Sequence, residues 1–210
     1  MKKKIPQATI ERLVLYHRIL GEILEKEGLQ LISSTQLADR LEILPVQIRK
    51  DLSYCGHFGA RGIGYYVQDL RKKIKNVLGL QYRRKVAIVG AGNLGTALAN
   101  YKIFSEIDFK VSALFDNDTR IIGSEINCVK VYDAEKIQSV AQRKLIDIGI
   151  IAIPKTSAQK AVNDLISAGV KGIWNFSTAR LVVPENVALV NEDFMESLSA
   201  LSYHITLNED

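Results

Sequence analysis

Three glycines and one carboxylate have the spacing of a site that could bind the phosphates and ribose of a dinucleotide. Gly90, Gly92 and Gly95 form a G-x-G-x-x-G pattern directly after an apolar run. In such a loop the first glycine permits a tight turn, the second lets the backbone approach a pyrophosphate, and the third lets a helix pack closely on a sheet. Asp116 follows the last glycine at about the 20-residue offset expected for an acid that binds a ribose.

The elements that must position these residues occur in the required order. Residues 86–89 predict a short buried strand, and an amphipathic helical run follows the glycine loop from Thr96 to Tyr101. Residues 111–115 predict a second strand that ends on Asp116. Strand, loop, helix, strand and acid together predict a βαβ dinucleotide-binding unit, a stronger signal than the glycines alone. The predicted cofactor loop comprises Gly90, Ala91, Gly92, Asn93, Leu94 and Gly95.

The carboxylate at position 116 favours NAD(H) over NADP(H). A 2′-phosphate would meet like charge at Asp116, and the next two residues, Asn117 and Asp118, add no cation. Arg120 is the less favoured alternative that could bind such a phosphate.

Beyond Asp116, apolar runs alternate with helical segments. The runs predict strands at residues 129–132, 147–153, 172–175 and 187–190, with helices at 133–142 and 156–168. Because these runs are continuously apolar, they predict parallel strands that are covered on both faces. Ligands of such sheets bind beyond the carboxyl ends of the strands, so Ile153 and Pro154 are expected near the nicotinamide end of a cofactor.

The basic residues of the chain are concentrated before the glycine motif. Residues 1–84 contain 16 Lys or Arg and 8 Asp or Glu, a net charge of +8, whereas residues 85–210 contain 12 and 15, a net charge of −3. A small domain with this excess of positive charge is typical of a protein that binds a polyanion such as nucleic acid.

The helical pattern of this basic segment indicates a helix-turn-helix motif. Residues 5–27 predict a long helix ended by Gly28, and residues 36–41 predict a short helix capped by Ser34 or Thr35. A third helix is predicted from Val46, just after Pro45, to about Tyr54, with Ile48 and Leu52 facing inward. Its remaining faces carry Gln47, Arg49, Lys50, Ser53 and Tyr54.

The glycine-rich stretch after this helix predicts the hairpin of a winged helix. Four glycines between residues 56 and 64 exclude a regular helix, and Ile63, Tyr65 and Val67 alternate as in a strand. Arg61 would lie at the tip, beside Gly62, where it could enter a minor groove. A helix at 68–78 and a linker at 79–84 are expected to end this domain.

Other features limit the class of protein. No apolar run approaches the roughly 18 residues of a membrane span, and the two cysteines lack metal-ligand spacing, which favours a reduced, cytoplasmic protein without a metal. The last segment, from Glu192 to about Tyr203, predicts a helix with an apolar stripe. This helix either closes its own domain or packs on another subunit.

Three segments together resemble the Rex family of redox-sensing transcriptional repressors: QIRKDLSYCGHFGARGIGY, KVAIVGAGNLGTALANY and NEDFMESLSALSY. The resemblance covers nearly the whole chain. It implies an α/β protein with a winged helix-turn-helix domain at residues 1–84, a Rossmann-type parallel domain at 85–190, and a C-terminal helix at 191–210 that is exchanged in a homodimer. It also implies binding to palindromic operator DNA and release of that DNA when NADH binds, so that the NADH/NAD⁺ ratio is sensed.

The resemblance implies roles for individual residues as well. DNA contacts are expected from the recognition helix at residues 45–55 and from the wing at 58–65, which adds Arg61, Gly62 and Tyr65 to the helix residues named above. Asp116 is expected on the adenine ribose, and Phe194 near the nicotinamide across the dimer. Tyr101, Arg18 and Asp193 are expected to form a switch network.

The alternative is an NAD-dependent dehydrogenase with an accessory basic domain. Such an enzyme needs an acid–base group beside the nicotinamide. None of His17, His57 and His204 follows a predicted Rossmann strand, and Lys155 is the only titratable residue in a suitable place. We therefore expect a regulator without catalytic residues.

Overall fold

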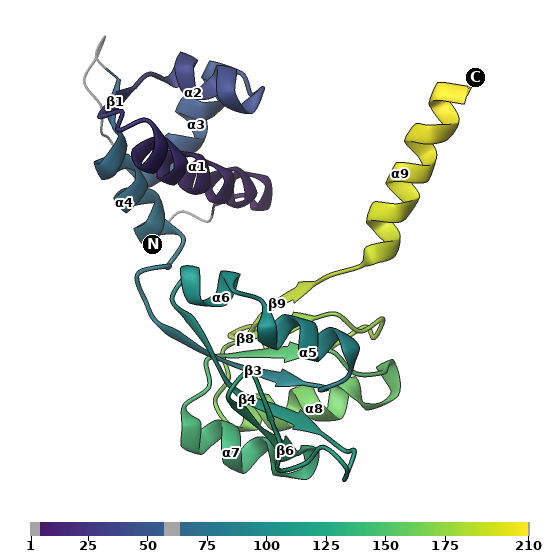
Figure 1. Cartoon of the computed structure of the whole chain (residues 1–210). Helices are drawn as coiled ribbons and strands as arrows, with labels where there is room; N and C mark the ends of the chain where they lie inside the picture. The colour runs from purple at the N-terminus through teal and green to yellow at the C-terminus, as the bar shows by residue number, and fades with distance from the viewer. Residues whose placement is uncertain (1–4, 57–63, 210) are drawn as a thin grey trace. The chain divides into compact units, whose positions relative to one another are not determined.

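The structure, a computed structural model, describes residues 5–56 and 64–209. The chain divides into two compact units, with the boundary between Tyr82 and Arg83 (Figure 1). No helix within the described ranges is long and apolar enough to cross a membrane. The same ranges contain no group of His, Cys, Asp and Glu side chains placed to hold a metal ion.

The first unit is a small helical domain with a two-stranded sheet. Its elements are α1 (Gln7–Lys26), β1 (Leu31–Ile32), α2 (Ser34–Leu41), α3 (Pro45–Leu52), a 3₁₀ turn (Ser53–Cys55), β2 (Tyr65–Tyr66) and α4 (Val67–Val77). Leu13, Leu20, Ile48, Leu70 and Ile74 are among the side chains that form its buried core. The predicted helix-turn-helix is α2 and α3, with the inward positions Ile48 and Leu52 buried as expected.

Three details of this unit differ from the sequence prediction. The N-cap of α2 is Ser33, whose hydroxyl accepts a hydrogen bond from the Gln36 backbone in a complete capping box. Residues 31–32, which gave no strand signal, pair with β2 in an antiparallel sheet. Val67, which the sequence analysis placed in the hairpin strand, is the first residue of α4. The strand β2 ends at Tyr66. The wing tip, with Arg61 and Gly62, lies outside the described residues.

The second unit is a Rossmann-type domain with a seven-stranded sheet, which confirms the predicted fold class. The strand order is β5-β6-β4-β3-β7-β8-β9, and all pairs are parallel except β5 with β6. The strands are β3 (Arg84–Val89), β4 (Phe109–Asp116), β5 (Glu125–Ile126), β6 (Val129–Asp133), β7 (Ile148–Ile151), β8 (Gly172–Asn175) and β9 (Ala188–Asn191). The helices are α5 (Asn93–Asn100), α6 (Ile103–Glu106), α7 (Ile137–Lys144), α8 (Lys155–Ser167) and α9 (Phe194–Glu209), with a 3₁₀ turn at Ala134–Lys136. Two short elements, α6 and β5, were not predicted, and the helix predicted at residues 133–142 begins with the 3₁₀ turn.

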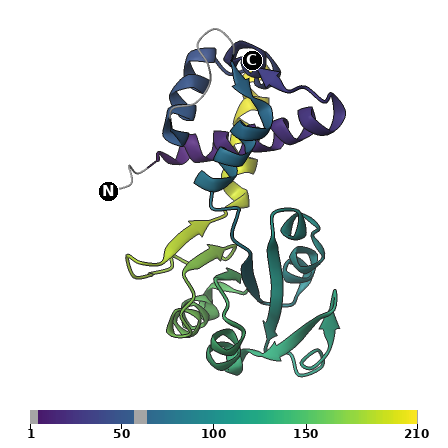
Figure 2. The same ribbon diagram turned by 90° about the vertical axis from the view of Figure 1, so that its left-hand side faces the viewer.

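Both faces of this sheet are covered by helices (Figures 1 and 2). Ala87 and Val89 of β3 belong to the buried cluster that also contains residues of α7 and α8. Val86 and Ile88, on the opposite face, belong to the cluster that contains Ala99 of α5. Successive residues of β3 therefore enter opposite apolar layers, one on each face of the sheet. This is what a continuously apolar strand predicts.

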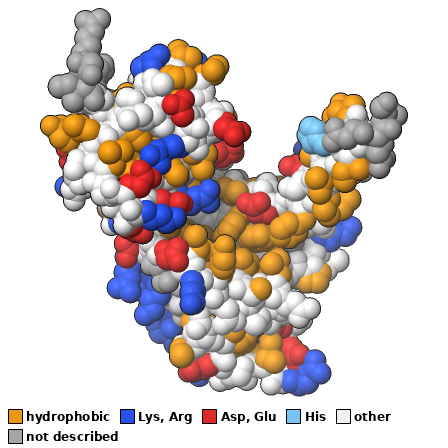
Figure 3. All heavy atoms as spheres, turned by 45° about the horizontal axis from the view of Figure 1, so that its top comes forward, with side chains coloured by type: hydrophobic (Ala, Val, Ile, Leu, Met, Phe, Trp, Pro, Cys, Tyr) orange, Lys and Arg blue, Asp and Glu red, His pale blue; other side chains and the backbone are white. Residues whose placement is uncertain are grey.

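The last helix, α9, is not packed on the sheet of its own unit. Its side chains from residue 194 to residue 207 are all exposed, although large hydrophobic residues are frequent among them. Figure 3 shows these hydrophobic side chains in orange along α9, at the right of the view. A helix of this composition needs a covering surface, which residues 5–56 and 64–209 of the single chain do not supply.

Candidate functional site

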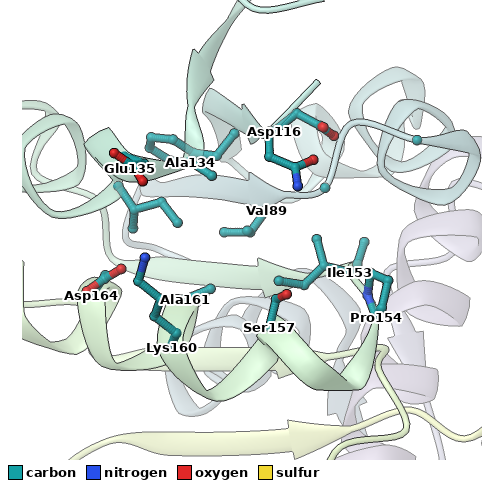
Figure 4. A pocket seen from close by; sticks show the side chains of 16 residues that line it. Val89, Asp116, Ala134, Glu135, Ile153, Pro154, Ser157, Lys160, Ala161 and Asp164 are labelled. Atoms are coloured by element: carbon teal, nitrogen blue, oxygen red, sulfur yellow. The ribbon is translucent and has the colours of Figure 1, made fainter. Parts of the chain in front are cut away.

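A cavity of about 530 Å³ opens where β3, β4 and β7 end, which is where the strand order reverses direction. Ligands of open parallel sheets bind at this switch point. The volume is within the range of small-molecule and cofactor sites, about 300–1,000 Å³. Its lining comprises Val89, Gly90, Gly92, Phe115, Asp116, Asn117, Ala134, Glu135, Ile137, Ala152, Ile153, Pro154, Ser157, Lys160, Ala161 and Asp164 (Figure 4).

The three glycines of the loop have separate structural roles. Gly90 has a φ of +99°, and a Cβ there would overlap the carbonyl oxygen of Ala152 at the end of β7. A Cβ at Gly95 would overlap the Gly90 carbonyl, so this glycine allows α5 to pack against the loop. A Cβ at Gly92 would meet nothing within 4 Å, and Gly92 lines the cavity. Gly90 and Gly95 are therefore required by the fold, whereas the space at Gly92 is free for a ligand.

The carboxylate of Asp116 is held at the cavity by two backbone groups. Its Oδ2 accepts a hydrogen bond from the Ala91 N–H at 2.7 Å, and its Oδ1 accepts one from the Asp118 N–H at 2.9 Å. Because each carboxylate oxygen can accept a further bond, Asp116 can still bind two ribose hydroxyls. The bond to Ala91 also connects the acid directly to the glycine loop.

Arg120 is already paired with Asp118. Its Nη2 lies 2.7 Å from Oδ2 of Asp118, and its Nε lies 2.9 Å from Oδ1. These hydrogen bonds lower the pKa of Asp118 to about 2. The preference for NAD(H) rests on the carboxylate of Asp116 at the cavity, which would meet a 2′-phosphate with like charge.

Two walls of the cavity come from residues that the sequence analysis did not identify. Ala134 and Glu135 follow β6, and Ser157 and Lys160 belong to the first two turns of α8. Figure 4 shows Lys160 extending across the cavity toward the segment that carries Glu135. These residues could have been found in the sequence, because they follow directly after strands that end at the ligand-binding edge of the sheet.

Two predicted cofactor residues lie away from this cavity in the single chain. Tyr101 is 60% exposed and lines a second cavity, of about 460 Å³, with Lys102 and Phe104. Phe194 is 59% exposed and packs near Phe176, with ring centroids 6.1 Å apart. By contrast, Ile153 and Pro154 line the main cavity. Ala91, Asn93, Leu94 and Gly95 shape the loop and the start of α5 but are not among the lining residues.

The titratable residues that line the main cavity are Asp116, Glu135, Lys160 and Asp164, and none of its lining residues is a histidine. Lys155, the one acid–base candidate, begins α8 but is not part of the lining. The arrangement favours binding of a dinucleotide over proton transfer to a second substrate.

The outward face of α3 is cationic. Arg49, Lys50 and Ser53 are exposed, and Arg49 donates a hydrogen bond to Ser34 Oγ at the start of α2, at 3.0 Å. Tyr54 and Tyr65 are half-buried. An exposed basic second helix of a helix-turn-helix is the surface that enters a DNA major groove.

The side chain of Gln47, which was predicted to contact DNA, is hydrogen-bonded to Asp51 within the domain. Its side-chain amide donates to Asp51 Oδ1 at 2.9 Å. The Asp51 carboxylate also accepts hydrogen bonds from Thr9, Arg12 and Tyr16 of α1. Burial alone would raise the pKa of Asp51, but these hydrogen bonds outweigh it and lower the pKa below its usual value. This network attaches the recognition helix to α1.

The two remaining switch candidates lie in different units. Arg18 is an exposed residue of α1. Asp193 precedes α9 and accepts a hydrogen bond from the Met195 N–H at 2.8 Å, so that its side chain caps this helix.

Comparison with known proteins relates both units to one group of regulators. Residues 4–53 match the family model described as putative DNA-binding protein N-terminus, and residues 81–179 match the CoA binding domain model. The chain is 41% identical to the redox-sensing transcriptional repressor Rex of Clostridium perfringens strain 13, over 99% of this chain and 98% of that protein. It is 43% identical to the Rex of Desulfitobacterium hafniense over 96% of each chain.

Solved structures show the same relationship. The chain aligns with the Rex-family repressor RSP in complex with β-NAD⁺ and operator DNA, with a TM-score of 0.93 and 40% identity, over 99% of this chain and 95% of that one. RSP in complex with β-NADH aligns with a TM-score of 0.87 and 39% identity, over 99% and 97% of the two chains.

Proposed function

The chain belongs to the Rex family of redox-sensing transcriptional repressors, and on that basis we propose that it binds palindromic operator DNA and releases it when NADH binds. The observation that carries this function is the presence of two surfaces in one chain: the cavity with Asp116 and the glycine loop, and the exposed cationic helix α3. The first unit, with its net charge of +8 over residues 1–84, supplies the DNA-binding surface. The cavity supplies the sensor.

The working form is a homodimer in which α9 is exchanged between subunits. The exposed hydrophobic residues of α9 need a partner surface, and a second copy provides one by symmetry. We assign residues 1–84 to the winged-helix domain, residues 85–190 to the NAD(H)-binding domain and residues 191–210 to the exchanged helix. In the dimer, the wing residues Arg61, Gly62 and Tyr65 would contact DNA beside α3.

The redox state of the cofactor acts through the charge of its nicotinamide. NADH has a neutral dihydronicotinamide ring, which can enter an apolar pocket, whereas the cationic ring of NAD⁺ would lose solvation there. Phe194, exposed in the single chain, would contribute to this pocket from the second copy, beside Ile153 and Pro154. Since a ligand shifts an equilibrium only by its difference in affinity for the two states, NADH would favour the dimer that does not fit DNA.

Tyr101, Arg18 and Asp193 would connect the two sites. Tyr101 and Arg18 are exposed, and Asp193 lies at the start of the exchanged helix. A pair between Arg18 and Asp193 that forms in only one dimer state would couple the cofactor to the spacing of the two recognition helices.

A dehydrogenase is the less favoured function, because the cavity lining provides no histidine and Lys155 lies outside it. NAD(H) would act as a ligand and would not be turned over. The regulator is expected to work in the cytoplasm, where its cofactor and operator DNA are present.

The test is a binding titration with the full-length protein. A fluorescent operator duplex, selected from a randomised palindromic library, would be titrated with protein in the presence of NADH or NAD⁺ at one fixed salt concentration. We expect NADH to weaken operator binding by at least about tenfold more than NAD⁺ does. Equal effects of the two cofactors would exclude redox sensing.

A further inference from the structure

Two large aliphatic side chains are exposed at the start of the recognition helix. Leu44, the N-cap residue of α3, is 71% exposed, and Val46, in the first turn, is 61% exposed. Scattered exposed hydrophobic residues are normal on protein surfaces. These two flank Pro45 at the start of the helix that carries the exposed cations Arg49 and Lys50.

The Leu44 side chain weakens the helix that it begins. The Leu44 position makes no side-chain capping hydrogen bond, whereas the neighbouring helix α2 begins with a complete capping box from Ser33 and Gln36. Ser, Thr, Asp or Asn at this position would cap the helix, and leucine cannot. Because α1, α4, α5 and α8 also begin without a side-chain cap, it is the exposure of Leu44 that sets this position apart.

Val46 lies on the same face of α3 as the cationic residues. Val46, Arg49 and Lys50 have the spacing i, i+3 and i+4, which places them on one side of α3, and Ser53 follows in the 3₁₀ turn. All four are exposed, while Ile48 and Leu52 on the other side are buried. The Val46 side chain therefore faces the same partner as Arg49 and Lys50. The positive charge of these two residues fits a DNA partner.

The chemistry of the major groove determines which base an aliphatic side chain can recognise. In a helix-turn-helix the N-terminal residues of the second helix contact base edges. Thymine is the only base that presents a methyl group in the major groove. The polar residue of this first turn, Gln47, has its amide group bound to Asp51 at 2.9 Å. Leu44 at the N-cap and Val46 in the first turn are then the large exposed side chains at this end of α3.

We propose that Leu44 and Val46 recognise the C5-methyl groups of thymines in the operator half-site, which makes them specificity residues of the recognition helix. The inference rests on the proposed function, since it requires that α3 enters operator DNA. It adds a prediction about the preferred operator sequence. Each half-site contains at least one thymine whose methyl group contributes to binding, in addition to its hydrogen-bonding groups.

Replacing thymine by deoxyuridine tests this directly, because uracil differs from thymine only by the missing methyl group. The selected operator would be prepared with thymine or deoxyuridine throughout both half-sites, and binding would be measured with full-length protein. Wild-type protein should bind the deoxyuridine duplex more weakly, by about fourfold for each methyl group that it buries. The double variant L44A/V46A should bind the thymine duplex more weakly and bind both duplexes with equal affinity.

The matched control is V14A, which removes an exposed aliphatic side chain from α1 in the same domain. It should keep the preference for thymine. The inference is overturned if wild-type protein binds the two duplexes equally, or if L44A/V46A retains the wild-type preference. Operator binding and NADH-dependent release by the wild-type protein are measured in the same experiment. Their absence would instead contradict the proposed function.

Discussion

The carboxylate of Asp51 in α3 accepts two hydrogen bonds from the guanidinium of Arg12 in α1, 2.6 Å from Nε and 2.9 Å from Nη2. The Asp51 side chain is 1% exposed and that of Arg12 is 28% exposed. Tyr16 also donates to Asp51, at 2.9 Å, so the long helix α1 holds the recognition helix through this buried carboxylate as well as through the apolar core. The orientation of the DNA-binding surface therefore depends on a residue that cannot touch DNA itself.

We expect Asp51→Ala to destabilise the first unit by about 3 kcal/mol, because it leaves Arg12 and Tyr16 without their buried partner. The loss would be measured by urea denaturation followed by far-UV circular dichroism. The single tryptophan, Trp174, lies in the second unit, so its fluorescence transition should remain unchanged. Asp39→Ala, at an exposed position of α2, is the control with little effect. A joint shift of both transitions would show that the network also supports the second unit.

His17 should make the first unit less stable in mild acid. Burial, and then the charges of Arg71 and Lys75, lower the pKa of His17 below 6.5, and its Nε2 is buried without a hydrogen-bond partner. The folded state then binds its proton less readily than the unfolded state does. Stability is fully present above pH 6.5 and decreases as the pH falls from 6.5 toward the lowered pKa. The melting temperature of His17→Gln between pH 5 and 7 should vary less than that of the wild type.

The control for this pH dependence is His204→Gln, which changes an exposed histidine of α9. It should leave the wild-type slope unchanged. Equal slopes for wild type and His17→Gln would show that His17 does not contribute to the pH dependence.

Substitutions at two glycines should separate cofactor binding from folding. A Cβ at Gly92 enters open space beside the cavity, so Gly92→Ala should leave the free energy of unfolding within about 1 kcal/mol of wild type while the NADH response is lost. Gly95→Ala should destabilise the second unit by roughly 1–3 kcal/mol, since the added methyl group overlaps the Gly90 carbonyl. For both variants, urea denaturation followed by Trp174 fluorescence measures the free energy of unfolding, and operator release measures the NADH response. A normal NADH response in Gly92→Ala would place the pyrophosphate elsewhere.

Asp116→Ala should weaken the response to NADH by about 10- to 100-fold, the effect expected when hydrogen bonds to a charged acceptor are lost. Operator binding without cofactor should be unchanged, because Asp116 belongs to the second unit. The concentration of NADH needed for half-maximal operator release is the quantity to measure. Glu185→Gln, an exposed change away from the cavity lining, is the control. If operator affinity falls together with the NADH response, the two sites are not separate.

The apolar stripe of α9 should be required for dimerisation. Phe194, Leu198, Leu201 and Ile205 recur on one side of this helix and are all exposed in the single chain. Leu198→Asp combined with Leu201→Asp should weaken the dimer by roughly 3 kcal/mol or more, because unpaired charges would be buried at the interface. Light scattering coupled to size-exclusion chromatography measures the mass. Ser199→Asp, on the opposite side, should remain dimeric, and a dimeric double variant would exclude α9 from the interface.

Features that depend on neighbouring residues could be predicted from the sequence alone. Spacing and hydrophobic period located the βαβ unit, the acid at position 116 and the two helices of the helix-turn-helix, because each is determined within a few turns of chain. The same patterns placed the parallel strands to within a few residues. The N-cap of α2, predicted as Ser34 or Thr35, is Ser33, one or two residues earlier, because all three hydroxyl side chains are suitable caps and the backbone chooses among them.

Only the tertiary structure decided which distant residues meet. Lys160 and Glu135 line one cavity because the segments that follow β7 and β6 both begin at the carboxyl edge of the sheet, although β3 and β4 lie between these two strands, and no local pattern records that arrangement. Asp51 reads as an ordinary helical surface residue until α1 packs over it with Arg12 and Tyr16. Sequence periodicity specifies which face of an element is apolar, but the partner of a buried polar group is determined by packing between elements. The residue types that bind the cofactor could therefore be predicted from the sequence. The positions of these residues relative to one another are determined only by the fold.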